Sequence, residues 1–311
     1  MKKLLPLFVL LVALVPGPFH AEADAEPEVS IVAPYEAGRG FESRGALDRL
    51  VLASLEARGI RPSNPCSDAV FLRRVFIDLT GTLPEPAEIR AFLRDRGEDR
   101  RARLIDRLLE RDTFVDLWTL KWGDILRIKA EFPIKLWPNG VQAYHRWLHE
   151  AVRTNMPYDR MAHALLTSSG SNFRVAPVNF YRAVQDRSPE GIASAVALTF
   201  LGQRFEAWPE ERRQGFASFF QHLTYKPTAE WKEEILIHDP APTAAFEATL
   251  PDGQVVKIPA DTDPRLAFTR WLLAKDNPYF ARAMANRLWS WLLAVSYTHL
   301  TLPTSSVMGW W

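Results

Sequence analysis

The stretch from Asp68 to Pro84 constrains the fold more than any other part of the chain. Ser67 or Asp68 is suited to cap the start of a helix, and Gly81 followed by Pro84 marks its end. Between them, apolar side chains recur at helical spacing, at Leu72, Val75, Phe76 and Leu79. Because this helix is so apolar, we expect it to lie at the centre of a packed domain.

The same periodicity continues along the chain and predicts a mainly α-helical protein. Further helices are expected at 45–58, 86–93, 100–110, 112–127, 139–152, 158–168, 189–201, 209–223, 263–272 and 279–293. Residues 171–186 have no period and are expected to form a long loop. Of the 311 residues, 47% are hydrophobic and 24% charged, a globular composition able to bury a sizeable core.

One small β-hairpin element is expected near the C-terminal end of this multi-helix globular domain. Phe246–Leu250 and Gln254–Ile258 are β-prone runs on either side of Pro251–Gly253, which supplies an Asp-Gly turn. The segment Glu234–His238 alternates as a strand does.

The amino terminus predicts export. Lys2 and Lys3 precede an apolar run, Leu4–Val15, and Ala21–Ala23 has the small-residue pattern of a signal-peptide cleavage site. The apolar run is short and contains a proline, which favours a cleaved signal over a membrane anchor. The expected location is therefore periplasmic or extracellular. No second run is long enough to cross a bilayer, so no membrane span is expected after cleavage.

Charge and cysteine content exclude further classes. Lys and Arg number 38 against 37 Asp and Glu, so the clustered basic excess typical of nucleic-acid binding is missing and no nucleic-acid partner is expected. Cys66 is the single cysteine, which excludes an internal disulfide. A lone cysteine beside a helix start is typical of a packing residue rather than of a nucleophile.

Several motifs together carry a family resemblance. Ser67–Pro84 resembles the signature of the planctomycete cytochrome-associated domain of unknown function (number fifteen forty-nine). The likeness continues through Arg107–Leu109, Trp122–Asp124, Asn155–Asp159, Phe200–Gly202 and Lys226–Glu234. The resemblance implies an exported, helical protein, of a kind often fused to cytochrome c modules and without an established activity.

The resemblance extends to a second domain but not to a haem site. Asn277–Trp289 resembles the opening of the partner domain (number fifteen fifty-three), which normally follows the first. Many members of the family carry Cys-x-x-Cys-His after the Phe-Leu-Gly segment, and this motif attaches haem. Here Phe200–Trp208 contains no cysteine. No cofactor is therefore expected, and haem-based electron transfer is nearly excluded.

The last residues do not fit the rest of the chain. Val295–Thr304 resembles the translation of a sequencing adapter, so the chain is expected to be a fragment whose own C-terminal domain is missing. The predicted organisation is a signal peptide (1–23), a flexible lead-in (24–44), a helical domain (45–239), a β-hairpin linker (240–262), the start of a second helical domain (263–294) and an artefact tail (295–311).

Charged side chains on the apolar helices are the candidate binding residues. They are Arg73, Arg74, Asp78, Asp124 and Arg127. Arg74 and Asp78 stand one turn apart and are suited to pair. The group either forms an ion-paired structural network or lines a polar cleft for an anion such as a sulfated or uronic sugar. Asn286 and Arg287 on the last helix either dock the two domains or belong to a site completed by the missing part.

No complete catalytic or metal-binding motif is present. His145 and His149 are one helical turn apart, a spacing that suits a metal, but no third ligand is defined, so structural histidines are favoured and no metal is expected. The chain lacks a glycine-rich phosphate loop and a Gly-x-Ser-x-Gly motif. Tryptophans at 118, 122, 147, 271 and 289 follow apolar stripes, which favours core packing over a sugar-stacking surface.

Two functions fit these observations. The first is a non-catalytic binding or scaffold module, linked to polysaccharide processing, with glycans or other exported proteins as partners. The alternative is a hydrolase whose active site is completed by the missing C-terminal domain.

Overall fold

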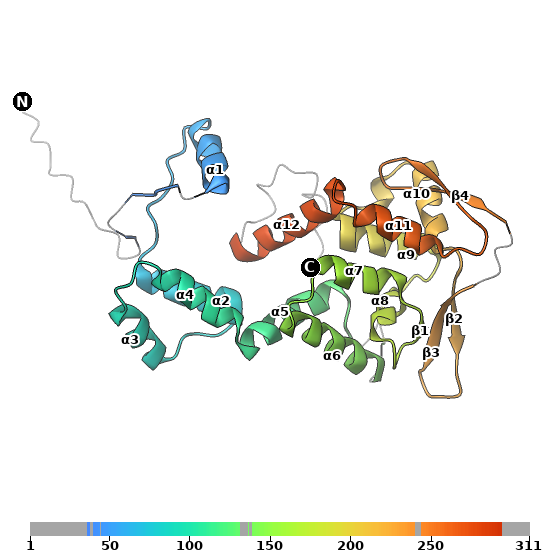
Figure 1. Ribbon diagram of the computed structural model, residues 1–311, viewed down its shortest axis with the longest axis horizontal. Coiled ribbons are helices and arrows are strands. Elements are labelled where there is room, and N and C mark those ends of the chain that lie inside the picture. The colour runs from blue at the N-terminus through green and yellow to red at the C-terminus, as the bar shows by residue number, and fades with distance from the viewer. Residues whose placement is uncertain are drawn as a thin grey trace, which may run out of the picture. The chain divides into compact units, whose positions relative to one another are not determined.

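The computed structural model describes residues 36–37, 40–43, 45–130, 136, 139–239 and 244–293 (Figure 1). The predicted signal peptide, most of the predicted lead-in and the predicted tail at 295–311 lie outside the described residues. The chain divides into two compact units, Met1–Ser67 and Asp68–Trp311. Each unit is described on its own.

The described part of the first unit consists of one helix and a short bridge. Helix α1 spans Ala46–Glu56 and buries none of its residues. It ends at Glu56, before the predicted end at Arg58, and the turn that follows contains Gly59, whose left-handed φ of +66° is easily adopted by glycine. Glu36 pairs with Cys66 in an isolated β-bridge, and the Asn64 amide donates to the Glu36 carboxylate at 3.0 Å.

The second unit begins with a small cluster of four helices. These are α2 (Asp68–Thr80), α3 (Pro86–Arg94), α4 (Arg100–Leu109) and α5 (Asp112–Ile125). Leu72, Val75, Phe76 and Leu79 of α2 are buried against Phe92, Leu104, Leu108 and Trp118 of the other three helices. The predicted apolar helix is present, but it was expected at the centre of the packed domain, and α2 instead packs in this small cluster and contributes no residue to the larger core.

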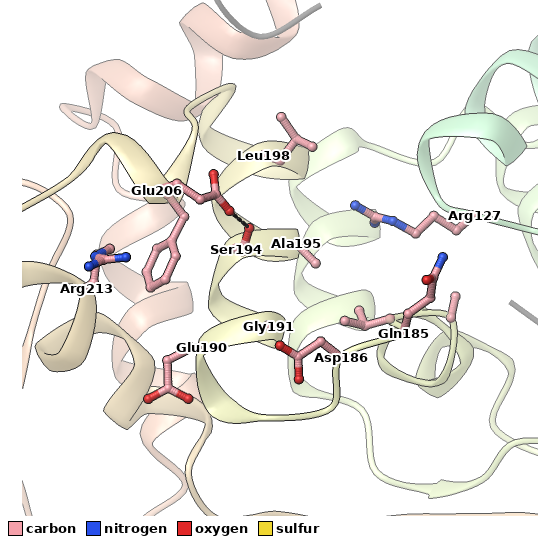
Figure 2. A pocket seen from close by; sticks show the side chains of 13 residues that line it. Arg127, Gln185, Asp186, Glu190, Gly191, Ser194, Ala195, Leu198, Glu206 and Arg213 are labelled. Carbon is pink, nitrogen blue, oxygen red and sulfur yellow. Dashed lines mark hydrogen bonds between the residues drawn. The ribbon is translucent and has the colours of Figure 1, made fainter. Parts of the chain in front are cut away.

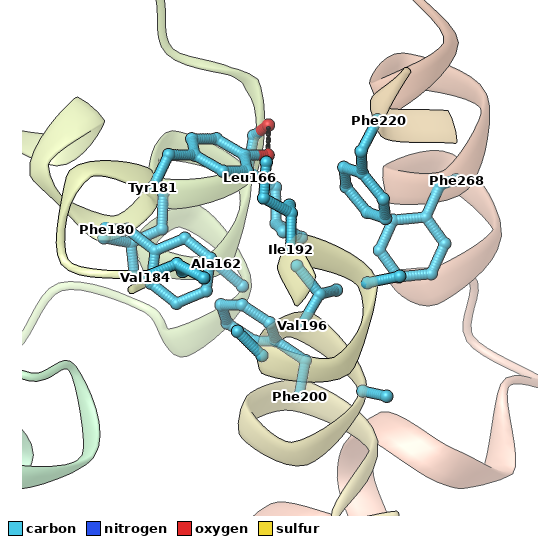
Figure 3. Packing of buried hydrophobic residues seen from close by; sticks show 14 of the residues in the cluster. Ala162, Leu166, Phe180, Tyr181, Val184, Ile192, Val196, Phe200, Phe220 and Phe268 are labelled. Atoms are coloured by element: carbon cyan, nitrogen blue, oxygen red, sulfur yellow. Dashed lines mark hydrogen bonds between the residues drawn. The ribbon is translucent and has the colours of Figure 1, made fainter. Parts of the chain in front are cut away.

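A larger core continues through the rest of the unit. It is covered by α6 (Asn139–Arg153), α7 (Tyr158–Thr167), α8 (Asn179–Arg182), α9 (Pro189–Val196), α10 (Glu210–Ala217), α11 (Pro264–Leu272) and α12 (Pro278–Leu293). Aromatic side chains fill its middle, as Figure 3 shows for Phe180, Phe200, Phe220 and Phe268. The chain is thus mainly helical, as predicted. No helix in the described part is long and apolar enough to span a membrane.

Two small antiparallel sheets interrupt the helices. The predicted hairpin is present, with β4 (Phe246–Thr249) paired to β5 (Val255–Ile258) around Gly253, which has a φ of +93°. A three-stranded sheet has the order β1-β3-β2, formed by β1 (Gly170–Ser171), β2 (Leu223–Pro227) and β3 (Glu234–His238). The strand at 234–238 is as predicted.

Two local predictions were wrong. Residues 171–186 are not one loop, because they contain a 3-10 turn (Ala176–Val178) and α8. Pro177–Val184 is almost wholly buried, so this run shows no amphipathic period. The helix predicted at 209–223 ends at Ala217 and is followed by a 3-10 turn (Ser218–Phe220) and then β2. Tertiary packing of Phe216, Phe219 and Phe220 on Phe268 decides the conformation there.

The helix predicted at 189–201 changes its winding part-way. Helix α9 passes into a π-helical turn, Ala197–Leu201, which ends at Gly202 with a φ of +62°. Helix α12 packs against this turn. Asn277 caps α12 through backbone N–H groups of Tyr279 and Phe280 and also donates to the Trp271 carbonyl.

Residues assigned to the predicted linker and second domain share the large core. Ala248, Ile258, Phe268 and Leu272 are all buried in it. The predicted domain boundaries themselves stay predictions.

Candidate ligand-binding pocket

Of the seven predicted site residues, only Arg127 lines the pocket described below. The other six, which do not line it, are Arg73, Arg74, Asp78, Asp124, Asn286 and Arg287. Arg74 and Asp78 form an ion pair on α2 with a nitrogen–oxygen distance of 3.6 Å, as their spacing predicted. Arg73, Arg74 and Asp124 are exposed, so they do not form a buried network.

Arg127 lies just beyond the end of α5, in an unusual conformation. Its φ of +58° is left-handed, which is uncommon for a residue with a Cβ. Its side chain is half-buried, and the guanidinium donates a long hydrogen bond, 3.5 Å, to the Thr199 hydroxyl in the π-helical turn. Burial lowers the pKa of Arg127, and the neighbouring Tyr144 opposes this only in part.

Arg287, which lies on α12, also contacts Thr199. Its two terminal nitrogens each donate to the Thr199 backbone carbonyl at 3.1 Å. Burial lowers the pKa of Arg287, and the phenol of Tyr158 beside it opposes the shift. Two guanidiniums therefore meet at Thr199. Within the described residues, neither of them forms an ion pair with a carboxylate.

Buried polar atoms without a hydrogen-bond partner accompany the two arginines. They include the hydroxyls of Tyr144 and Tyr158 and the Nδ2 atom of Asn286. Burial raises the pKa of Tyr158 to about 12, and its ring is stacked on Phe280 with centroids 4.6 Å apart. Such unpaired buried groups are uncommon in folded proteins and call for an explanation. Asn286 and Arg287 are adjacent residues of α12.

A pocket of about 490 Å³ opens on the other side of Arg127. Its walls come from the end of α5, residues 183–186, helix α9 with its π-helical turn, and the segments around Glu206 and Arg213. Figure 2 shows the Arg127 guanidinium and the Gln185 amide on one side of the pocket. Across α9, the Ser194 hydroxyl donates to the Glu206 carboxylate at 2.7 Å.

The start of α9 fixes one wall. Ser188 caps the helix by accepting from the Gly191 backbone N–H at 3.1 Å, and its own N–H donates to the Asp186 carboxylate at 2.9 Å. Hydrogen bonding from Ser188 to the Asp186 carboxylate lowers the pKa of Asp186. A Cβ atom at Gly191 would lie 2.3 Å from the Asp186 carbonyl oxygen, so this close approach requires glycine.

The lining is suited to a polar ligand with both hydroxyl and anionic groups. Asp186, Glu190 and Glu206 supply carboxylate acceptors, and Gln185 supplies an amide. Two cations line the pocket, Arg127 and Arg213, and Arg213 is already paired with Glu210. Ser194 donates to a carboxylate rather than to a histidine, so it is not arranged as an activated nucleophile.

The two candidate metal ligands, His145 and His149, are neighbours in the structure. The His145 and His149 rings lie 6.1 Å apart, and His149 Nε2 is 3.2 Å from an Asp116 carboxylate oxygen. The described part of the chain holds no group of three or more His, Cys, Asp or Glu side chains suited to a metal ion.

Comparison with known families places the chain. Residues 46–221, more than half of the chain, match the family PSCyt2, described as a protein of unknown function (DUF1549). The chain belongs to this family. All residues that line the pocket lie within the PSCyt2 match, whereas Asn286 and Arg287 lie beyond it. Neither the curated proteins nor the solved structures yield a match.

Several PSCyt2 pocket residues were missed by the sequence analysis. Gln185 lies in the segment that was predicted to be a loop, where no motif marks it. Thr199, which does not line the pocket but accepts a hydrogen bond from Arg127, does have a signal in the sequence, because it is a polar residue in a very apolar helix, between Leu198 and Phe200.

Proposed function

We propose that this protein is an exported, non-catalytic binding module whose pocket takes an acidic saccharide. The observation that carries the proposal is Arg127, a desolvated cation without a carboxylate partner among the described residues, at the wall of a hydrogen-bonding pocket. An unpaired buried charge is costly to a fold, so a ligand that supplies the missing anion would bind there with a large gain.

The rest of the lining fits a sugar. Saccharide hydroxyls donate well to carboxylates such as Asp186 and Glu206, and the Gln185 amide both donates and accepts. The pocket volume of about 490 Å³ falls within the usual range for small-molecule sites. The anionic group of the ligand, a carboxylate or a sulfate ester, would lie against Arg127.

Calorimetric titration with three sets of short oligosaccharides tests this proposal. The sets are oligogalacturonates, sulfated galactan oligomers and neutral galactan oligomers, so that the two anion chemistries are separated from each other and from a neutral sugar. We expect an acidic set to bind more tightly than the neutral set. Arg127→Gln should lower that affinity by about ten- to a hundredfold, because a hydrogen bond to a charged group contributes roughly 1.5–3 kcal/mol.

The matched controls are Arg127→Lys, which keeps the charge, and Arg146→Gln, which removes an exposed arginine outside the pocket. Arg127→Lys should lose less affinity than Arg127→Gln, and Arg146→Gln should bind as the wild type does. Equal affinity for acidic and neutral sugars, or no effect of Arg127→Gln, would overturn the proposal.

A hydrolase completed by a further C-terminal domain is the second candidate. It is favoured by the three carboxylates in the pocket, since pairs of carboxylates perform most glycoside hydrolysis. Chromatography of the oligosaccharides after long incubation with a protein that includes the C-terminal domain separates the two functions. Unchanged oligomers support binding alone, and shorter products support hydrolysis. A scaffold role toward other exported proteins would appear as co-purification without saccharide affinity.

The proposal also includes cleavage of a signal peptide and an adapter-derived origin for the last residues of the chain. The signal-like amino terminus supports cleavage after Ala23, and N-terminal sequencing of the secreted protein should then begin at Asp24. The resemblance of Asn277–Trp289 supports a partner domain, and that of Val295–Thr304 supports an adapter-derived tail. Resequencing of the gene across the codon for Ala294 tests both, and an unchanged sequence there would overturn the adapter interpretation.

A further inference from the structure

The turn between β2 and β3 carries an exposed tryptophan. Trp231 is 64% exposed, unlike Trp118 and Trp122, which are buried in the cores. Its neighbours Glu230 and Lys232 are also exposed, and the Lys232 ammonium lies 5.9 Å from the centroid of the indole ring. A large aromatic surface is therefore open to solvent between two charged side chains.

Hydrogen bonds from within the turn hold its shape. The Glu233 carboxylate accepts from the hydroxyls of Ser171 and Thr228, at 2.5 Å and 2.7 Å. The Thr228 hydroxyl in turn accepts from the Glu230 backbone N–H at 3.1 Å, and the Glu233 N–H donates to the Glu230 carbonyl at 3.2 Å. Because Ser171 belongs to β1, the turn is tied to the three-stranded sheet.

Buried side chains hold the residue after the tryptophan in a strained conformation. Lys232 has a left-handed φ of +63°. Its carbonyl accepts from Arg182 at 3.3 Å and from Asn172 at 3.4 Å, and both donors are buried. Strain of this kind persists only where the surrounding structure fixes it, and it gathers at functional sites. The turn is thus a rigid support, fixed before any ligand arrives, for one exposed ring.

We propose that Trp231 is a stacking platform for a sugar ring, separate from the pocket at Arg127. The C–H groups on one face of a pyranose suit the electron-rich face of an indole. The Lys232 ammonium lies over the indole ring, where it can donate to hydroxyls of a bound sugar, and the exposed Glu230 carboxylate next to it in the chain is an acceptor. The proposal rests on the proposed function in that the ligand is a saccharide.

The surroundings favour a sugar over a protein partner. A protein that buries a tryptophan usually surrounds it with contacts that exclude water. At this turn the exposed neighbours of Trp231 are polar or small, namely Glu230, Lys232 and Ala229. A single exposed aromatic ring with an ammonium over it and a carboxylate next to it in the turn suits a ligand that has an apolar face and many hydroxyls.

The experiment compares long and short ligands. The probes are polygalacturonate and a sulfated galactan as polymers, which are long enough to contact two separate sites, and their disaccharides, which contact one site at a time. We expect Trp231→Ala to weaken polymer binding by about tenfold or more and to leave disaccharide binding unchanged. Trp231→Phe, which keeps an aromatic face, should retain most of the polymer affinity.

Controls separate the platform from the pocket and from general damage. Val255→Ala removes another exposed apolar side chain, 56% exposed, on β5. It should bind as the wild type does, and the variants at Trp231 and Val255 should melt at the wild-type temperature. Arg127→Gln should weaken both polymer and disaccharide binding.

Each outcome decides between the proposals. Wild-type polymer affinity in Trp231→Ala, or an equal loss in Val255→Ala, overturns the platform and leaves the pocket. Loss in Trp231→Ala without loss in Arg127→Gln supports the platform and overturns the pocket. Absence of any saccharide binding by the wild-type protein overturns both.

Discussion

Buried and half-buried arginines in this protein have two kinds of surroundings. Arg265, which is 1% exposed, is held by the Asp263 carboxylate at 2.7 Å and by the Ser168 carbonyl. Arg182 is likewise buried and pairs with Glu234 at 2.5 Å. Within the described residues, Arg127 and Arg287 are hydrogen-bonded to hydroxyl and carbonyl oxygens and not to a carboxylate. The first two arginines are neutralised within the fold, whereas Arg127 brings an unpaired charge to the wall of the pocket.

Loss of the carboxylate partner of a buried arginine should strongly reduce the free energy of unfolding. Asp263→Asn keeps a side chain able to cap α11 but removes the charge that neutralises Arg265. We expect a loss of about 3–5 kcal/mol in the free energy of unfolding, because the guanidinium stays buried without its counter-ion. Urea denaturation measures the change. The control is Asp276→Asn, at an exposed position, which should unfold as the wild type does.

Replacement of Arg127, which has no carboxylate partner among the described residues, should instead raise the free energy of unfolding. Arg127 combines a desolvated charge with a left-handed backbone, and Arg127→Gly removes both costs. We expect the free energy of unfolding to rise by about 1 kcal/mol, since strain of this type costs of order 1–3 kcal/mol and glycine itself adds entropy to the unfolded chain. The same variant should lose affinity for the acidic saccharide. A lower stability in Arg127→Gly would contradict a functional origin for this conformation.

At the scale of elements, amphipathic helices could be predicted and buried irregular segments could not. Helix α2 has a clear stripe because one of its faces is packed and the other is exposed. Pro177–Val184 is almost wholly buried, so its residues show no contrast between faces. The π-helical turn at Thr199 is decided by packing against α12, nearly ninety residues later in the chain, as the Arg287 bonds to Thr199 show. Periodicity cannot register such long-range contacts.

The pocket residues, too, could be predicted only in part. The sequence marks Arg127 and Arg287 as charges beside apolar stripes, but the side chains that complete the pocket come from α9 and from the 183–186 segment. These have ordinary identities, such as Gln185 and Ser194, and only the fold brings them to Arg127. The other charged residues, Arg73 and Asp124, were equally prominent in the sequence and lie exposed.

Contact between helix α10 and strand β4 should depend on one glycine. A Cβ atom at Gly215 would lie 2.2 Å from the Thr249 hydroxyl oxygen and 2.5 Å from its Cβ. Alanine normally stabilises a helix interior relative to glycine by roughly 0.5–1 kcal/mol. We expect Gly215→Ala to destabilise the protein instead, by about 1–3 kcal/mol, because the added methyl overpacks the contact.

Gly123 in α5 is the matched control for Gly215. A methyl group added at Gly123 would have its nearest neighbour on Ile128, 3.9 Å away, which is an ordinary contact. Gly123→Ala should therefore leave stability unchanged or raise it by up to about 1 kcal/mol. Thermal unfolding of the two variants compares them directly. Similar melting temperatures for both would show that β4 moves freely relative to α10.

At the scale of the whole molecule, arginine–carboxylate pairs tie separate parts of the second unit together. Asp68 of α2 pairs with Arg101 of α4 at 2.8 Å, Glu88 of α3 with Arg111, and Glu234 of β3 with Arg182. Burial raises the pKa of each carboxyl, but hydrogen bonds and charge from the arginines outweigh it. The pKa values of Asp68, Glu88 and Glu234 are therefore all below their ordinary values of 3.8, 4.5 and 4.5.

These shifts predict how stability depends on pH. A carboxyl whose pKa is lower in the folded state contributes stability above its unfolded pKa, and this contribution is lost as pH falls through the folded value. Burial also lowers the pKa of His238 below 6.5, so protonation of this side chain opposes folding in the same direction. We expect the free energy of unfolding to decline gently below about pH 6.5 and steeply below about pH 4.5.

Urea unfolding at a series of pH values measures this profile, and one variant assigns part of it. Glu234→Gln has no charge to lose, so its stability should be lower than that of the wild type near neutral pH and should converge with it in acid. A parallel offset at all pH values would mean that Glu234 acts through shape rather than charge. Convergence would show that ionised carboxylates, through their arginines, hold the three-stranded sheet and its tryptophan-bearing turn to the helical core.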